Sequence, residues 1–216
     1  MTDICPLCNG PAIYLCTFKN RGYYQCDKCE LAFVPAYQHL SEPEELKRYD
    51  LHNNSAESES YIKYLTQVAA YLSKIPVLDP VILDFGSYKT HVLSDILREK
   101  GYESYPYDPC YKVGLENLDR KYDIIIICEV IEHLGDIMKE INLLKRLLSP
   151  HTGYILIRTE LYDTEKDIEK WWYTNDETHI FLPSEHTISV IGEYLCRDLV
   201  YSDGKRYLIL GPSASS

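Results

Sequence analysis

The sequence is short of positive charge. Its 216 residues include 22 Lys and Arg against 33 Asp and Glu, which gives a net charge of −11 with His neutral. Broad binding to a phosphate backbone depends on clustered Lys and Arg, so this balance disfavours a nucleic-acid partner. It leaves open a nucleotide or RNA held in a local pocket.

Long apolar segments are also lacking. The densest run covers residues 124–128 and 130–131, far fewer than the roughly 20 residues that span a bilayer. The first residues have no basic region followed by an apolar stretch, so no secretory signal is expected. We therefore expect a cytoplasmic protein with no membrane partner. Hydrophobic residues still make up 45% of the chain, which is enough for a packed core.

The eight cysteines do not have the distribution of a disulfide framework. Four of them lie singly in the chain, at Cys16, Cys110, Cys128 and Cys196. The other four form two C-x-x-C motifs near the N-terminus, made by Cys5, Cys8, Cys26 and Cys29. Each motif places two thiolates on one tight turn, and four thiolates in tetrahedral arrangement favour zinc. Disulfides are the alternative, and they fit a reducing compartment poorly.

We therefore predict a zinc ribbon over residues 1–40, with strands at 13–18 and 22–25. The metal is expected to be structural, because about 40 residues cannot build a sufficient core alone. A recognition surface for substrate or partner is the alternative role. The segment carries three basic and three acidic side chains, which again disfavours nucleic-acid binding.

The rest of the chain reads as two helices followed by an α/β region. Ser41 and Glu44 predict a capping box for a helix at 42–50, and a second helix is expected at 57–74. Residues 77–211 alternate strands (81–86, 103–107, 122–128, 154–159, 199–201, 207–210) with helices (90–100, 136–148, 184–195). This order predicts a Rossmann-like, mostly parallel sheet with helices on both faces. The tail at 212–216 is expected to be disordered.

Four segments of the α/β region resemble class I, S-adenosylmethionine (SAM) methyltransferases. Residues 81–86 resemble their first strand and turn, 105–108 the second strand, 122–133 the fourth strand with its E-V-x-E-H turn, and 147–154 the approach to the fifth strand. Residues 48–55 and 171–181 resemble bacterial members that carry an N-terminal zinc ribbon. The resemblance implies a SAM-dependent methyltransferase whose helical segment, 41–76, covers the mouth of the active site.

The resemblance also implies a SAM site at the carboxyl ends of the strands. Its expected residues are Asp84, Gly86, Ser87, Asp108, Cys128 and Glu129. Asp108 is expected to hold the ribose, while Gly86 and the backbone at 128–129 flank the methionine part. The family's first turn reads D-x-G-C-G-x-G, but Tyr88 and Thr90 stand here in place of the later glycines. A side chain at a position that needs positive φ or close approach of the backbone adds strain and blocks space.

The candidate catalytic residues are Glu132, His133 and His179. Glu129, Glu132 and His133 have the i, i+3, i+4 spacing of one helical face. Joined by His179, they resemble the metal site of ubiquinone-type and small-RNA O-methyltransferases. Three interpretations stay open: these four residues hold Mg²⁺ or Mn²⁺, His133 or His179 is a general base, or all are ordinary polar residues.

Candidate substrate contacts are His52, Asn54, Trp172 and Tyr173. An exposed helix end is the alternative for the first pair, and packing against the sheet is the alternative for the aromatic pair. We expect methyl transfer to an oxygen of a small molecule, ahead of nitrogen or carbon. The alternative, favoured by the altered glycine turn, is a catalytically idle fold that uses its zinc ribbon as a binding or assembly module. The sequence does not predict the oligomeric state.

Overall fold

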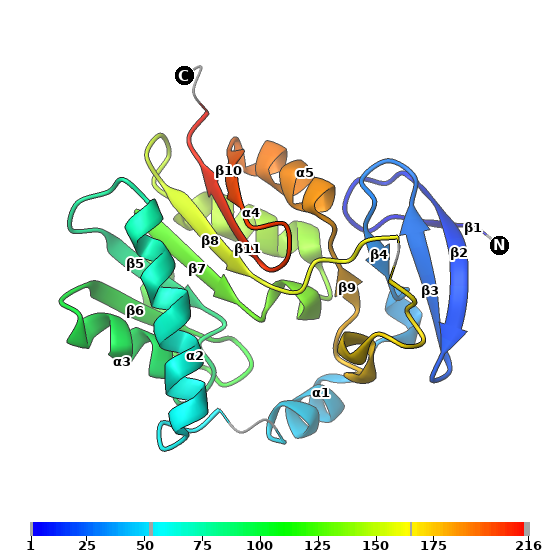
Figure 1. The fold of residues 1–216 in the computed structure, drawn as a ribbon, viewed down its shortest axis with the longest axis horizontal. Helices are drawn as coiled ribbons and strands as arrows, with labels where there is room; N and C mark the ends of the chain where they lie inside the picture. Colours follow the sequence, from blue (N-terminus) through cyan, green and yellow to red (C-terminus); the bar gives the residue numbers. More distant parts are fainter. Residues whose placement is uncertain (1, 52–53, 165, 214–216) are drawn as a thin grey trace.

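The computed structural model describes residues 2–51, 54–164 and 166–213, and their strands form two sheets (Figure 1). The small sheet has the order β1 (Thr2–Ile4), β2 (Pro11–Phe18), β3 (Arg21–Cys26), β4 (Ala32–Phe33) and β9 (Phe181–Leu182). The large sheet has the order β10 (Asp198–Ser202), β11 (Tyr207–Gly211), β8 (Tyr154–Arg158), β7 (Ile124–Cys128), β5 (Val81–Phe85) and β6 (Glu103–Tyr107).

Helices connect these strands at the predicted places. The α-helices are α1 (Glu42–Tyr49), α2 (Glu59–Ala70), α3 (Val92–Glu99), α4 (Ile137–Leu147) and α5 (Glu185–Leu195). The 3-10 helices are η1 (Ala36–Gln38), η2 (Tyr71–Lys74), η3 (Leu115–Asp119), η4 (Ile131–His133) and η5 (Trp172–Asn175). Ser41 and Glu44 form the predicted capping box of α1. None of the helices in the described part of the chain is long and apolar enough to cross a membrane.

The large sheet is parallel across β6, β5, β7 and β8, and it ends in two antiparallel pairings through β11 and β10. Alternate side chains of the central strand β7 lie on opposite faces of the sheet. Ile124 and Ile126 pack in the core beneath α2 and α3, whereas Ile125 and Ile127 pack in the core beneath α4 and α5. A strand buried on both faces needs a continuous apolar sequence, which explains the run in β7. The predicted α/β class is confirmed.

The small sheet is continuous with the α/β region. Strand β4 pairs with β9, where Phe33 lies opposite Phe181. Buried residues of the cysteine-rich segment, such as Leu7 and Leu31, belong to the same core cluster as Ile188 of α5. The N-terminal forty residues therefore share a sheet and a core with the remainder, and a domain boundary at residue 40 stays a prediction.

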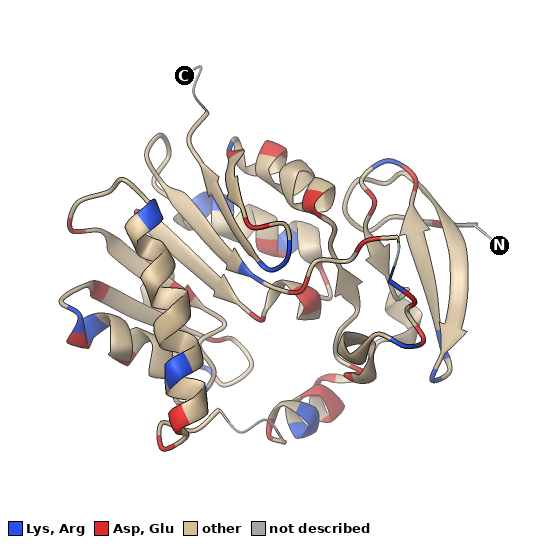
Figure 2. Ribbon diagram, in the orientation of Figure 1, with Lys and Arg blue, Asp and Glu red and all other residues tan. Residues whose placement is uncertain are grey.

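Helix α1 lies beyond the carboxyl ends of the parallel strands, between α2 and the small sheet (Figure 1). Figure 2 shows Lys and Arg dispersed among Asp and Glu, with both signs on α1 itself. Asp50, directly after α1, accepts hydrogen bonds from Lys89 Nζ at 2.5 Å and from Tyr111 Oη at 3.1 Å. The helical segment is thereby joined to the loop that follows β5. Of the predicted disordered tail, residues 214–216 lie outside the described part of the chain.

Candidate active site

A cavity of about 640 Å³ opens at the carboxyl ends of β5, β6 and β7. Most predicted site residues line it: Asn54, Asp84, Gly86, Ser87, Asp108, Cys128, Glu129, His133, Trp172, Tyr173 and His179. Glu132 lies behind this wall and is fully buried. His52 falls outside the described residues. Open α/β sheets bind ligands beyond the carboxyl ends of their strands, which is where this cavity lies.

Gly86 makes the turn between β5 and the cavity. Its φ is +83°, and a Cβ built on it would lie 2.2 Å from Val130 Cγ2. Its N–H and that of Ser87 both donate to the carbonyl of Tyr107, at 2.8 and 3.0 Å. Only glycine combines this left-handed backbone with so close a neighbour. The position kept from the family's glycine motif is therefore required by local packing.

The non-glycine residue Tyr88 still adopts the left-handed conformation, with φ of +58°. Its N–H donates to Asp108 Oδ2 at 2.9 Å, while its ring packs edge-on against Tyr111 at 4.7 Å between centroids. Its hydroxyl lies 3.5 Å from Asp50 Oδ1. The side chain of Tyr88 thus contacts the segments that follow β6 and α1. The turn keeps the left-handed backbone conformation that glycine favours, although the residue is tyrosine.

Asp108 directly follows β6 and lines the cavity. Each carboxylate oxygen accepts one backbone N–H, from Tyr88 at 2.9 Å and from Tyr111 at 3.1 Å. A carboxylate has about four acceptor positions, and the backbone of Cys110 also interacts with this one, so at least one position remains for a ligand such as a ribose diol. Burial raises the pKa of Asp108. The backbone N–H donors fix this carboxylate, as a specific ligand contact requires.

Asp84 and Cys128, two other predicted site residues, are hydrogen-bonded to side chains of the protein itself. Asp84 Oδ2 accepts from the N–H and the hydroxyl of Ser94, at 3.2 and 3.0 Å, near the start of α3. Burial raises the pKa of Asp84 to about 7. The Cys128 thiol lies 3.2 Å from Tyr64 Oη, and burial raises its pKa to about 12. Both residues shape the cavity floor, and neither is a charged group directed at solvent.

Glu129 does not share a helical face with Glu132 and His133. Its φ is +53°, and the turn that follows, η4, begins only at Ile131. The carboxylate forms an ion pair with Arg158 and accepts from Tyr64 Oη at 3.2 Å. The expected i, i+3, i+4 face was wrong for this residue, because the left-handed backbone at 129 turns it toward β8.

Glu132 is the buried centre of a hydrogen-bond cluster. Its carboxylate accepts from Thr159 Oγ1 at 3.1 Å and from the hydroxyl of Tyr173. Tyr173 also donates to Glu129 Oε2 at 3.1 Å. Burial, and then the nearby Glu132, raise the pKa of Tyr173 well above its ordinary value. The phenol therefore stays protonated and bridges the two carboxylates.

The two histidines stand beside this cluster with defined tautomers. Nδ1 of His133 lies 3.0 Å from the carbonyl of Thr178, and Nδ1 of His179 lies 2.7 Å from that of Tyr173. A carbonyl only accepts, so each Nδ1 carries the proton and each Nε2 is the acceptor of the neutral ring. Glu132, His133 and His179 offer ligand atoms within 4.8 Å of one another.

The buried His179 should make stability depend on pH. Burial, together with His133, lowers the pKa of His179 to about 4, against about 6.5 in an unfolded chain. Between these values the unfolded state binds more protons, so stability is present above pH 6.5 and is lost as the pH falls toward 4. The expected loss is about 2–3 kcal/mol. Urea unfolding at pH 7 and pH 4.5, without added Mg²⁺ or Mn²⁺, measures it.

The matched comparison for this pH effect is His179→Gln. Asp84 acts in the opposite direction over an overlapping range, because its raised pKa makes the folded state bind the extra proton. The difference between wild type and variant isolates His179, and this difference should shrink at pH 4.5. An equal destabilisation at both pH values would contradict the expectation.

The aromatic candidates lie at different depths. Trp172 is 62% exposed and packs edge-on against the buried Tyr173, with 5.2 Å between ring centroids. Asn54 is half-buried, and its carbonyl accepts from Thr90 Oγ1 at 2.8 Å. Trp172 thus stands at the rim of the cavity, Tyr173 stands in its wall, and Asn54 is bonded to the residue that replaces the last glycine of the turn.

Sequence reasoning missed Arg158, which ends β8 and pairs with Glu129 and Glu160. A basic residue after an apolar strand that is predicted to end at the site was the available signal. It also missed Tyr64 and Asp50, whose positions depend on the docking of α1 and α2. No spacing in the sequence indicates that docking.

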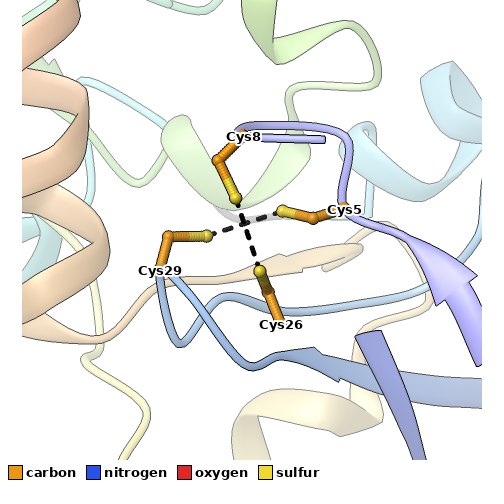
Figure 3. Close-up of side chains that lie close together, drawn as sticks. All are labelled: Cys5, Cys8, Cys26 and Cys29. Atoms are coloured by element: carbon orange, nitrogen blue, oxygen red, sulfur yellow. Dashed lines mark hydrogen bonds between the residues drawn. The ribbon is translucent and has the colours of Figure 1, made fainter. Parts of the chain in front are cut away.

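The four N-terminal cysteine sulfurs converge on one point (Figure 3). The Sγ–Sγ distance is 3.5 Å for Cys5 and Cys29 and 3.4 Å for Cys8 and Cys26. A disulfide needs about 2.05 Å, whereas sulfurs bound to one zinc at about 2.3 Å lie about 3.8 Å apart in a tetrahedron. The donor set and spacing fit a four-thiolate metal site.

Comparison with solved structures shows the class I methyltransferase fold. Mitomycin 7-O-methyltransferase MmcR is 12% identical with a TM-score of 0.57, and the match covers 80% of this chain and 59% of that one. LaPhzM is 15% identical with a TM-score of 0.51, covering 72% and 57%. Magnesium protoporphyrin IX methyltransferase ChlM from Synechocystis PCC 6803, solved with bound SAH, is 14% identical with a TM-score of 0.54, covering 80% and 96%.

The chain thus spans less than two thirds of MmcR and of LaPhzM. No curated protein sequence matches it. The sequence model of a family described as "Methyltransferase domain" matches residues 57–193. Because that match covers more than half of the chain, the protein belongs to the methyltransferase-domain family.

Proposed function

We propose that the protein transfers a methyl group from SAM to an oxygen of a small molecule. The observation that carries this proposal is one cavity lined both by Asp108 beside the Gly86 turn and by the histidine pair. Mitomycin 7-O-methyltransferase, one of the structural neighbours, is named as an O-methyltransferase. Cytoplasmic location and a small-molecule partner belong to the same proposal.

Residues at the carboxyl ends of β5, β6 and β7 would hold the cofactor. Asp108 would accept the ribose hydroxyls through the acceptor positions that Tyr88 and Tyr111 leave. Gly86 permits close approach of the backbone, since no side chain projects from it. Bound SAM supplies an electrophilic methyl group whose transfer needs a deprotonated, correctly placed acceptor atom.

His133 is the group that we assign to the acceptor proton. Its Nε2 is the basic nitrogen of the tautomer that Thr178 selects, and the residue lines the cavity. Taking a proton makes the ring cationic, and the nearby Glu132 carboxylate favours that charge. His179 stays neutral, because its pKa is lowered to about 4. His133 is therefore the general base, and Glu132 and His179 define its surroundings.

A divalent cation at Glu132, His133 and His179 is the second candidate, favoured by their ligand spacing of at most 4.8 Å. Each ring donates its Nδ1 proton to a carbonyl, as metal-binding histidines usually do. Glu129 is excluded from the set by its ion pair with Arg158. If Mg²⁺ or Mn²⁺ binds here, it would lower the pKa of a bound hydroxyl. Undiminished Mn²⁺ binding by Glu132→Gln would reject this site.

The test is calorimetric titration of the metal-loaded protein with SAM and with S-adenosylhomocysteine. We expect a Kd near 1 μM, about −8 kcal/mol, weakened about tenfold to a hundredfold by Asp108→Ala through loss of charged hydrogen bonds. The control is Asp119→Ala, an exposed acid in η3. No binding by folded wild-type protein would favour the alternative, an idle fold that acts as a binding or assembly module.

A further inference from the structure

Arg21 is a buried cation of the small sheet, and it contacts a loop far away in the sequence. It begins β3 and is only 6% exposed. Nη1 donates to the carbonyls of Glu177 at 2.8 Å and His179 at 3.4 Å. Nη2 donates to the carbonyls of Thr174 at 2.9 Å and Asp176 at 3.4 Å. One guanidinium thus joins four backbone positions of residues 174–179.

The same loop fixes the side chains of the histidine cluster. The carbonyl of Thr178 orients the ring of His133, and the loop carries His179 itself. Ile180 N donates to the carbonyl of Glu132 at 2.9 Å, which attaches the end of the loop to the third member of the cluster. A shift of the loop would therefore move both imidazoles relative to Glu132.

The geometry of these contacts requires arginine. A guanidinium is planar, permanently charged and has a rigid fork of donors, so it fixes several acceptors in one plane. A lysine ammonium is a single point of charge on a flexible stem and cannot span two pairs of carbonyls. The buried charge also needs all of these dipoles, because a buried cation without partners is costly. Arg21 and the loop therefore constrain each other.

We propose that Arg21 is a positioning residue for the active site, through which the cysteine-rich sheet sets the 174–179 loop and with it His133 and His179. The family match begins at residue 57, so a part of the chain outside the methyltransferase domain match completes the site. The consequence for methyl transfer rests on the proposed function. The control of loop geometry does not, and it can be measured separately.

The experiment is amide hydrogen exchange with peptide-level mass spectrometry on the full, metal-loaded chain. In Arg21→Met, exchange at residues 174–180 should become at least about tenfold faster, from the loss of charged hydrogen bonds. Exchange in β2 and metal content should stay at wild-type values. Arg21→Lys should recover only part of the protection.

Two variants control for other causes. Lys19→Met also removes a cation, in the turn before β3, but an exposed one that makes a single hydrogen bond of 3.3 Å to Asn175 O in the described part of the chain and lies 5.5 Å from the centroid of the Phe18 ring. Tyr23→Phe changes the same strand as Arg21, and it removes a buried hydroxyl that has no hydrogen-bond partner among the described residues. Both should leave exchange at 174–180 within about twofold of wild type, because neither removes an Arg21 contact.

Two results would overturn the proposal. One is unchanged exchange at 174–180 in Arg21→Met. The other is equal loss of protection in β2 and in the loop together with loss of metal, which would make Arg21 a residue of general stability. SAM affinity is measured on the same samples and should be unchanged in Arg21→Met, since the Gly86 turn and Asp108 are bonded to other segments. Absence of SAM binding in wild type would reject the proposed function and leave the exchange result intact.

Discussion

Replacing Cys26 with serine should lower the melting temperature by about 10–20 °C and release the metal that we propose for the four-cysteine cluster. Cys26 is fully buried at the end of β3. Structural zinc sites contribute their binding free energy to folding, and we take about 5 kcal/mol as the part lost with one ligand. For a chain of this size, each kcal/mol shifts the melting temperature by about 2–4 °C.

The expected loss is large because the cysteine cluster is part of the main core. Cys5, Cys26 and Cys29 belong to the core cluster that contains residues of β7 and α5. Thr187 Oγ1 in α5 donates to the carbonyl of Cys29 at 2.8 Å. A disordered cysteine turn would therefore expose apolar surface of the methyltransferase sheet and free the start of α5. We expect one cooperative unfolding transition, shifted as a whole.

Cys196→Ser is the matched control, because this cysteine is exposed and lies outside the cluster. It should melt within about 2 °C of wild type, as surface substitutions usually do. Metal content is measured on both variants by mass spectrometry of the native protein. Full zinc occupancy in Cys26→Ser, or equal melting temperatures for the two variants, would contradict a four-thiolate site.

The sequence predicted the local elements well because their signals are local. The capping box at Ser41 and the apolar run of β7 both depend on neighbours within one or two turns. The two C-x-x-C motifs were equally informative, since each fixes two ligands on one turn. The mostly parallel character of the large sheet then follows from the alternation of strands and helices, whereas its strand order was not predicted.

The contacts that complete the site could not be predicted, because they join segments more than a hundred residues apart. The pairing of β4 with β9 depends on two-residue strands that carry no periodicity. Arg21 donates to carbonyls that lie 153–158 positions away in the chain. Every residue has a backbone carbonyl, so the sequence does not indicate which carbonyls accept these hydrogen bonds. The turn at Glu129 was mispredicted for a related reason: an i, i+3, i+4 spacing gives no warning of a left-handed residue.

The altered glycine turn shows how tertiary contacts can replace a local preference. Tyr88 has a strained backbone with positive φ, but its ring contacts Tyr111 and its hydroxyl lies near Asp50. Lys89, next in the turn, forms an ion pair with Asp50 at 2.5 Å. The residues that depart from the family motif are thus the ones that attach the helical segment to the loop that follows β5, which agrees better with an adapted turn than with a decayed one.

Gly86→Ala should have the other large effect, because this position, unlike Tyr88, has no space for a side chain. A Cβ here would lie 2.2 Å from Val130 Cγ2 and 2.9 Å from Val130 Cγ1, on a backbone with φ of +83°. Backbone strain of about 1–2 kcal/mol and overpacking of about 1–3 kcal/mol together predict a loss of roughly 2–5 kcal/mol in the free energy of unfolding. SAM binding should be lost with it, since the turn and Val130 both line the cavity.

Gly101→Ala and a double variant separate the two causes of the Gly86 effect. Gly101 also has a positive φ, +88°, but no atom of residues 2–51, 54–164 or 166–213 lies within 4 Å of its added Cβ beyond its chain neighbours. Its alanine variant should therefore lose only the backbone part, about 1–2 kcal/mol, and keep SAM affinity. Val130→Ala removes both atoms that clash with the new Cβ, so Gly86→Ala should cost less in that background, by about 1–3 kcal/mol of coupling energy. Additive losses in the double variant would mean that the Gly86 turn tolerates a side chain as Tyr88 does. Gly86 would then be dispensable for packing, and any requirement for it would have to come from the bound cofactor alone.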